Sequence, residues 1–216
     1  MNKKQTALRI IPALLLATLA ACSTTGMQSA NTIPAIPAAA TVTLDAQTTA
    51  LLVLDINAAV CRPNPACTAT LPAISSLLNK ARAAKVPVIY STTVSPSGPP
   101  PQLEEIAPRT GEPIVMARAN KFVGTELEDI LKKDKIRTVV IVGSAANGAV
   151  MYSAFHANSK GFTAVVAEDG LSSPVPINTV LARYQMLNQP GFPNPGNTPL
   201  ADQRVTLSRS DLISFK

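Results

Sequence analysis

The sequence at residues 138–151 is TVVIVGSAANGAVM, and it decides the fold. Its apolar first half has the length of a buried strand, Gly143 leads a turn, and a helix-forming stretch begins at Asn147. This order puts backbone N–H groups and the first helical side chain at the carboxyl edge of a sheet, where open α/β proteins bind ligands. We therefore expect the chemistry of this chain at that edge.

Strand and helix patterns alternate on both sides of this stretch. The expected strands are residues 50–55, 86–92, 113–118, 138–142, 162–167 and 204–207. The expected helices are residues 70–84, with Thr70 as the cap, 125–133, 147–159 and 177–187. Regular alternation with right-handed crossovers predicts a three-layer α/β/α sandwich around a mainly parallel sheet.

Residues 140–150, Ser153-Ala154 and residues 161–169 together resemble the isochorismatase-like cysteine hydrolase superfamily. In most of its members a nucleophilic Cys stands where this chain has Ala149. Asn120-Lys121-Phe122 and Gly148-Ala149-Val150 are similar to a branch that has Ala at this position. The resemblance implies the same Rossmann-like fold and a hydrolase-type pocket without the usual nucleophile.

Asp55 ends the first strand, at the position where the resemblance places the acidic catalytic residue. Asp55-Ile56-Asn57 satisfies the Asp-x-Asn form of the superfamily motif. Burial at a strand end raises the pKa of a carboxyl group and suits it to acid or base catalysis near neutrality. The alternative is a carboxylate that caps a neighbouring loop.

The second catalytic residue of the superfamily is a Lys eleven positions before the Leu of a Gly-Thr-x-Leu segment. In this chain that segment ends at Leu127, and the count reaches Met116, so Arg118 and Lys121 are the nearby cations. Lys121 is therefore either a relocated catalytic cation or an ordinary surface Lys before a helix.

Ala149 excludes covalent catalysis at its position, because a methyl group has no lone pair for attack. The remaining chemistry implied by the resemblance is the hydrolysis of a vinyl ether, in which an Asp protonates the substrate and water adds. We expect Asp55 and Lys121 to be catalytic on a small polar substrate. The expected ligand contacts are Asn57, Arg118, Asn147, Gly148 and Ala149. The alternative is a catalytically inactive pocket kept for ligand binding or for envelope interaction.

The N-terminus has the pattern of a bacterial lipoprotein signal. Lys3, Lys4 and Arg9 precede an apolar run that is too short for a lasting transmembrane anchor, and Leu19-Ala20-Ala21-Cys22 resembles a lipobox. Lipidation at Cys22 would give stable membrane attachment. The alternative is an ordinary signal with an incidental Cys. By analogy with lipoprotein sorting, Ser23 in place of Asp favours the outer membrane, with the domain facing the periplasm.

The expected organisation is a signal peptide at 1–21, a flexible tether at 22–44 and one domain at 45–216. Of the net charge of +6, three positive charges lie in the signal, so the remainder carries +3. The basic residues are scattered and Trp is absent, which argues against nucleic-acid binding. The expected partners are a small-molecule ligand and the lipid anchor in the membrane, and the chain is compatible with a homo-oligomer.

Cys61 and Cys67 flank two prolines and an Asn, and in an oxidising compartment they predict a disulfide that pins a loop. Metal binding is the rival interpretation, but it needs further ligands, and His156 is the one His of the chain. The metal-binding Asp-x-His of nicotinamidases, members of the same superfamily, is missing. We expect no metal and no cofactor, and we expect His156 to serve in packing or at the surface.

Overall fold

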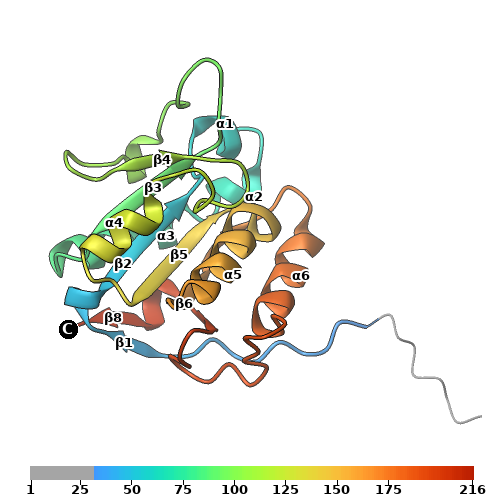
Figure 1. The fold of residues 1–216 in the computed structure, drawn as a ribbon. Helices are drawn as coiled ribbons and strands as arrows, with labels where there is room; N and C mark the ends of the chain where they lie inside the picture. Colours follow the sequence, from blue (N-terminus) through green and yellow to red (C-terminus); the bar gives the residue numbers. More distant parts are fainter. Residues whose placement is uncertain (1–31) are drawn as a thin grey trace, which may run out of the picture. The chain divides into compact units, whose positions relative to one another are not determined.

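The computed structural model describes residues 32–216, and its compact unit begins at Ile33. Six parallel strands form one sheet in the order β4-β3-β2-β5-β6-β7 (Figure 1). These strands are β2 (Thr49–Leu54), β3 (Val88–Thr92), β4 (Ile114–Met116), β5 (Thr138–Ser144), β6 (Thr163–Ser172) and β7 (Val205–Ser208). The α-helices are α1 (Ala58–Cys61), α2 (Pro65–Thr68), α3 (Leu71–Ala83), α4 (Leu127–Lys133), α5 (Met151–Ser159) and α6 (Pro176–Leu187). Shorter turns are η1 (Ala46–Thr48), η2 (Glu104–Ile106), η3 (Ala146–Val150) and η4 (Ser210–Leu212).

Alternate side chains of β2 enter two different hydrophobic cores. Leu52 and Leu54 pack in the core that contains α4, α5 and α6, whereas Leu51 and Val53 pack in the core that contains α3. Figure 1 shows α4, α5 and α6 on one face of the sheet and α3 on the other. Every residue of β2 is buried, as its unbroken apolar run requires. The predicted three-layer α/β/α fold is confirmed.

A second, two-stranded parallel sheet joins β1 (Val42–Leu44) to β8 (Ile213–Phe215). Neither strand was expected, and β1 lies within the segment predicted as a tether. The Ala40 N–H donates to the Leu207 carbonyl at 2.9 Å, and the Asn197 amide donates to the Ala38 carbonyl at 2.9 Å. Ordered structure therefore begins before residue 45, because these backbone groups are paired with the domain.

Two predicted boundaries and one predicted cap differ from the structure for local reasons. β6 continues past Ala167 to Ser172, because its last residues pair again with the end of β5 after a register shift. The helix expected from Asn147 begins only at Met151, since the wider turn η3 precedes it. The Thr70 hydroxyl makes no cap bond and donates instead to the Cys67 carbonyl at 2.7 Å.

Cys61 and Cys67 lie on the short helices α1 and α2, not on the predicted loop. Their sulfur atoms are bonded at 2.03 Å, and their Cα atoms lie 4.9 Å apart. Both residues are buried in the core on the α3 side of the sheet. The disulfide therefore supports the face that is opposite α4, α5 and α6.

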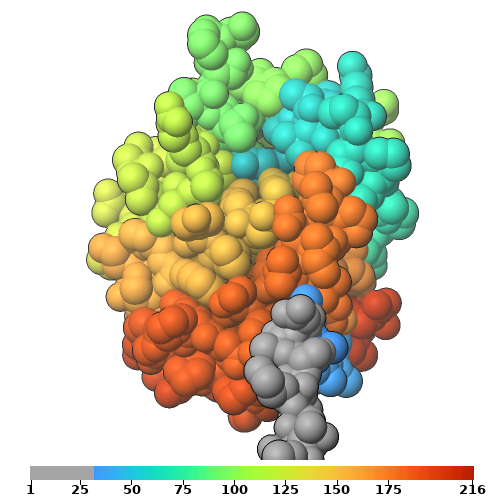
Figure 2. All heavy atoms as spheres, turned by 90° about the vertical axis from the view of Figure 1, so that its right-hand side faces the viewer, coloured from blue at the N-terminus to red at the C-terminus, as the bar shows by residue number. Residues whose placement is uncertain are grey.

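The helices α5 and α6 lie side by side on the face shown in Figure 2, where they are coloured yellow-orange and orange. Exposed apolar side chains mark the beginning of α6 and the residue before it, namely Val175, Ile177, Val180 and Leu181. Within residues 32–216, no helix has the length and apolar character that crossing a membrane requires.

We predict that Gly143→Ala lowers the free energy of unfolding by about 1–3 kcal/mol, because the added methyl group is overpacked. A Cβ atom at Gly143 would lie 2.5 Å from the Leu54 carbonyl oxygen and 2.8 Å from Leu54 Cβ. Urea unfolding of the full chain measures the effect. Gly196→Ala is the matched control, since a Cβ atom there meets no atom within 4 Å. Equal stability of the two variants would contradict the close approach of β5 to β2.

Candidate active site

A buried ion pair joins the end of β2 to the segment that follows β4. The Lys121 ammonium lies 2.7 Å from Asp55 Oδ2, and the two side chains are 0% and 5% exposed. Lys121 is therefore no surface residue, and that alternative is wrong. Met116, at the position where the superfamily spacing places its catalytic Lys, is 46% exposed.

The Lys121 ammonium uses all three of its N–H groups inside the protein. Besides Asp55 Oδ2, it donates to the Ala117 carbonyl at 3.0 Å and to the Arg118 carbonyl at 2.7 Å. A buried charge needs such complete pairing, because the desolvation of an unpaired charge is highly unfavourable. Lys121 therefore holds the carboxylate and the 117–118 backbone in one arrangement.

Ser91 on β3 supplies the other contact of the carboxylate. Its hydroxyl donates to Asp55 Oδ1 at 2.9 Å, and the Asp55 N–H donates to the Ser91 carbonyl at 3.2 Å. The pairing of Leu54 with Ser91 brings these groups together. Asp55 has a φ of 56°, a left-handed conformation that persists in a non-glycine residue only where surrounding contacts fix it.

Burial raises the pKa of the Asp55 carboxyl above its usual value of 3.8, although Lys121 and Ser91 both oppose the shift. Desolvation disfavours the charged form, and here it exceeds the stabilisation by the ammonium and the hydroxyl. A carboxyl group with a raised pKa is suited to proton transfer closer to neutral pH. The raised pKa expected from burial is therefore present, and the Asp55 side chain pairs with Lys121 and Ser91 and does not cap a loop.

Asp55 lines a hollow of about 640 Å³ at the carboxyl edge of the sheet. The other lining residues come from the loop after β3 and from the segment after β4; they are Thr93, Val94, Pro96, Arg118 and Ala119. A second hollow of about 450 Å³ borders it and shares Val94, Arg118 and Ala119. Of the expected ligand contacts, Arg118 faces these hollows.

The turn η3 does not reach either hollow. Neither hollow is lined by Asn147, Gly148 or Ala149. The Ala149 side chain is only 3% exposed and packs in the core that also contains Leu54. The Asn147 Oδ1 atom accepts a hydrogen bond from the Ser173 hydroxyl at 3.3 Å, and the Gly148 N–H donates to the Ala145 carbonyl at 3.0 Å. The structure therefore does not bring these three predicted ligand contacts to the open space beside Asp55.

Asn57 is also committed inside the protein. Its Oδ1 atom accepts from the Val60 N–H at 3.1 Å and so caps α1, while its amide donates to the Thr92 hydroxyl at 3.4 Å. The side chain is fully buried. Asn57 shapes the backbone beside Asp55 and does not face the hollow, which corrects its prediction as a ligand contact.

Ser91 is the residue of this site that sequence reasoning missed. It lies near the end of β3, next to Thr92, where a Ser carries no local signal of a role. Only the pairing register of β2 with β3 identifies it, because that register places its hydroxyl beside Asp55.

His156 lies outside the site and serves in packing, as expected. Its ring stacks on Phe122 with centroids 4.9 Å apart, and Nδ1 lies 3.0 Å from the Asn120 amide nitrogen. Burial lowers the pKa of His156, and a nearby lysine lowers it further. Within residues 32–216, no cluster of three His, Cys, Asp or Glu side chains could hold a metal ion.

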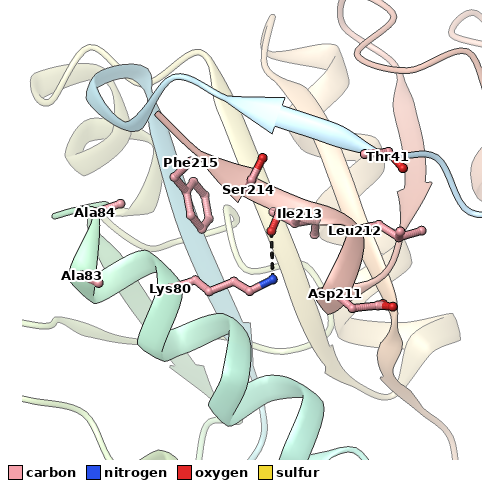
Figure 3. Close-up of a pocket in the computed structure, with 9 residues that line it drawn as sticks. All are labelled: Thr41, Lys80, Ala83, Ala84, Asp211, Leu212, Ile213, Ser214 and Phe215. Atoms are coloured by element: carbon pink, nitrogen blue, oxygen red, sulfur yellow. Dashed lines mark hydrogen bonds between the residues drawn. The ribbon is translucent and has the colours of Figure 1, made fainter.

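A separate hollow of about 560 Å³ lies between the end of α3 and β8 (Figure 3). The Lys80 ammonium in it donates to the Ser210 carbonyl at 2.8 Å and to the Ile213 carbonyl at 3.1 Å. These contacts fasten α3 to the C-terminal segment. None of the predicted site residues lines this hollow.

The isochorismatase domain model matches residues 49–191. This chain belongs to the isochorismatase family. The match includes Asp55, Ser91 and Lys121, and so it covers the ion pair and the hydrogen bond that position the carboxylate.

Two curated relatives and a solved structure are similar to this chain, which spans less than two thirds of the length of each of the two curated relatives. The chain is 33% identical over 113 residues to a secreted isochorismatase effector, Isc1, of Verticillium dahliae. The matched region covers 48% of this chain and 60% of that protein. It is 34% identical over 74 residues to an N-carbamoylsarcosine amidase of an Arthrobacter species. This matched region covers 34% of this chain and 28% of that protein. The crystal structure of a cysteine hydrolase from Pseudomonas syringae has a TM-score of 0.67 at 14% identity, covering 78% of this chain and 91% of that chain.

We predict that Lys121→Met lowers the free energy of unfolding by about 3–5 kcal/mol, because it leaves the buried Asp55 carboxylate without its counter-ion. Urea unfolding of the full chain at neutral pH measures the loss. Lys133→Met, an exposed position on α4, is the matched control and should unfold like the wild-type chain. A Lys121→Met variant as stable as the control would show that the ion pair does not support the fold.

Proposed function

We propose that this isochorismatase-family chain is a hydrolase that uses Asp55 as its acid–base group and no cysteine nucleophile. One observation carries the proposal: a buried carboxyl group, held by Lys121 and Ser91, lines a hollow large enough for a small molecule. Small-molecule sites commonly have volumes of roughly 300–1,000 Å³ and a few fixed polar groups.

In the proposed reaction, the protonated Asp55 carboxyl delivers its proton to the vinyl carbon of a vinyl-ether substrate. The substrate becomes an oxocarbenium ion, and Lys121 stabilises the carboxylate that remains. Water then adds to the cationic carbon and gives up a proton, which restores the Asp55 carboxyl. The resulting hemiketal separates into a carbonyl compound and an alcohol, so that one water is consumed for each bond cleaved.

The surroundings of the cysteines support a mechanism without a thiolate. We infer that Ala149 stands at the position of the family nucleophile, and its side chain is a methyl group in the core. Cys61 and Cys67 are bonded to each other and lie in the core on the α3 side of the sheet, whereas Ala149 lies in the core on the opposite side. No thiolate from these residues is at hand for attack.

A non-catalytic ligand-binding or envelope-interaction protein is the second candidate. It is favoured by the complete use of the Lys121 donors and by the packing of Ala149 away from the hollows. In this candidate the ion pair serves only to fix the shape of the ligand site. Catalytic turnover separates the two candidates.

We predict that Asp55→Asn lowers kcat/KM at least about 100-fold on any substrate that the wild-type chain hydrolyses. The proton donor is the neutral carboxyl, so the wild-type rate should fall as the pH rises through the raised pKa of Asp55. A screen of the full chain against vinyl ethers, esters and amides, with pH profiles, measures both effects.

Asp129→Asn, an exposed position on α4, is the matched control for this screen and should leave the rate unchanged. Treatment with iodoacetamide should also leave it unchanged. Turnover that survives in Asp55→Asn would remove Asp55 from the mechanism. A complete absence of turnover would favour the ligand-binding candidate.

We further propose that the protein is a lipoprotein of the bacterial envelope, anchored through Cys22 and facing the periplasm. The support is the lipobox-like Leu19-Ala20-Ala21-Cys22, which lies outside the described residues. Ser23 after this Cys favours the outer membrane. The disulfide of Cys61 and Cys67 suits an oxidising compartment.

We predict that Cys22→Ser abolishes labelling by a palmitate analogue and leaves the precursor uncleaved by the lipoprotein signal peptidase. The sulfur atom of Cys22 is the atom that accepts the lipid, and Ser has an oxygen in its place. Gel mobility and metabolic labelling in a bacterial host measure the outcome, with Ser23→Ala as the control. Unchanged labelling of Cys22→Ser would rule out this anchor.

A further inference from the structure

The two hollows beside Asp55 border each other along a common wall. Val94, Arg118 and Ala119 line both of them. Asp55 lines the first of these hollows, and Tyr152 of α5 lines the second. We call this combined space the Arg118 groove.

Apolar side chains gather in the Arg118 groove. Of the ten large hydrophobic side chains that are exposed within residues 32–216, four line it: Val94, Met116, Val123 and Tyr152. Val94 is 62% exposed and Tyr152 is 52% exposed, so both present their surfaces to solvent. A clustered apolar surface inside a concavity is typical of a ligand site. A purely polar substrate would leave this surface unused.

The groove carries one uncompensated positive charge. Asp55 and Arg118 are its charged lining residues, and the Asp55 carboxylate is neutralised by Lys121. Within residues 32–216, the Arg118 guanidinium forms no hydrogen bond or ion pair with the protein. Arg118 is exposed beside the hollows, so its guanidinium is open to a ligand. A free guanidinium binds a carboxylate through two parallel N–H donors.

The backbone of Arg118 is fixed relative to Asp55. Its carbonyl oxygen accepts a hydrogen bond from the same Lys121 ammonium that pairs with the Asp55 carboxylate, at 2.7 Å in each case. The ion pair therefore fixes the backbone of Arg118 as well as the position of the Asp55 carboxylate. The exposed guanidinium extends from this fixed backbone.

We propose that the Arg118 groove selects small carboxylic acids with an apolar body. The carboxylate pairs with the Arg118 guanidinium, and the apolar part lies against Val94, Met116 and Tyr152. This inference rests on the proposed function for the reacting end at Asp55, and it replaces the small polar substrate expected from the sequence. Arg118 is thereby a specificity-determining residue.

Equilibrium binding to the full chain tests the proposal with three probes: phenylacetate, phenylacetamide and acetate. Phenylacetamide matches the size of phenylacetate without its charge, and acetate keeps the charge without the apolar body. By isothermal titration calorimetry, we expect phenylacetate to bind about tenfold more tightly than either of the others. The preference over the amide should weaken as the salt concentration rises.

Arg118→Gln should remove the preference of the groove for phenylacetate over phenylacetamide. Met116→Ser should reduce the preference for phenylacetate over acetate and leave the preference over the amide. Arg137→Gln is the matched control, because Arg137 is exposed at the opposite, amino edge of the sheet, next to the start of β5.

Equal affinities for the acid and the amide would overturn the proposal, as would an acid preference that survives in Arg118→Gln. The absence of phenylacetate binding up to about 10 mM would also overturn it, because a Kd above that concentration is too weak for a specific ligand site. The titration needs no turnover. An inactive chain that keeps the Arg118-dependent preference would thus refute the hydrolase proposal and retain the specificity of the groove.

Discussion

The ion pair between Asp55 and Lys121 is the contact on which the arrangement of the site depends. Two charges removed from water are tolerated only when their remaining hydrogen-bonding capacity is filled, and here Ser91 and the carbonyls of Ala117 and Arg118 fill it. These groups come from the end of β2, from β3 and from the segment after β4. Register errors between those strands would leave a buried charge without a partner. The pair therefore couples the correct assembly of the sheet to the correct shape of the hollow beside it.

The polar groups of the site lie on one side of the carboxyl edge. In η3, Ala149 contributes a methyl group to the core. The open space is instead lined by the loop after β3 and the segment after β4, which present Val94 and Arg118. A buried acid beside an apolar hollow favours proton transfer, since desolvation keeps the carboxyl group protonated to higher pH. The family fold is retained, and no residue of η3 lines either hollow.

A solved cysteine hydrolase shares this fold over most of both chains at 14% identity, so the fold tolerates change at most positions. What the fold requires is the alternation of buried strands and amphipathic helices, together with a few close approaches such as that of Gly143 to Leu54. The additional pairing of β1 with β8 adds to the core on the α3 side and brings residues near both ends of the described chain together. These features stabilise the scaffold, and the site is built on it by only a few side chains.

The sequence by itself determined the three-layer fold, the acidic residue at the end of β2 and the nearness of Cys61 and Cys67, because each is written in a local pattern. Strand and helix periods, a strand-end carboxylate and a short spacing all act over a few neighbouring residues. Tertiary structure alone decided that Lys121 is buried, that Ser91 positions Asp55 and that η3 is packed away from the hollows. It also decided that residues before 45 join the domain through β8. These outcomes depend on pairing register and on which acceptors converge on one ammonium, and such contacts between distant segments leave no periodic trace in the sequence.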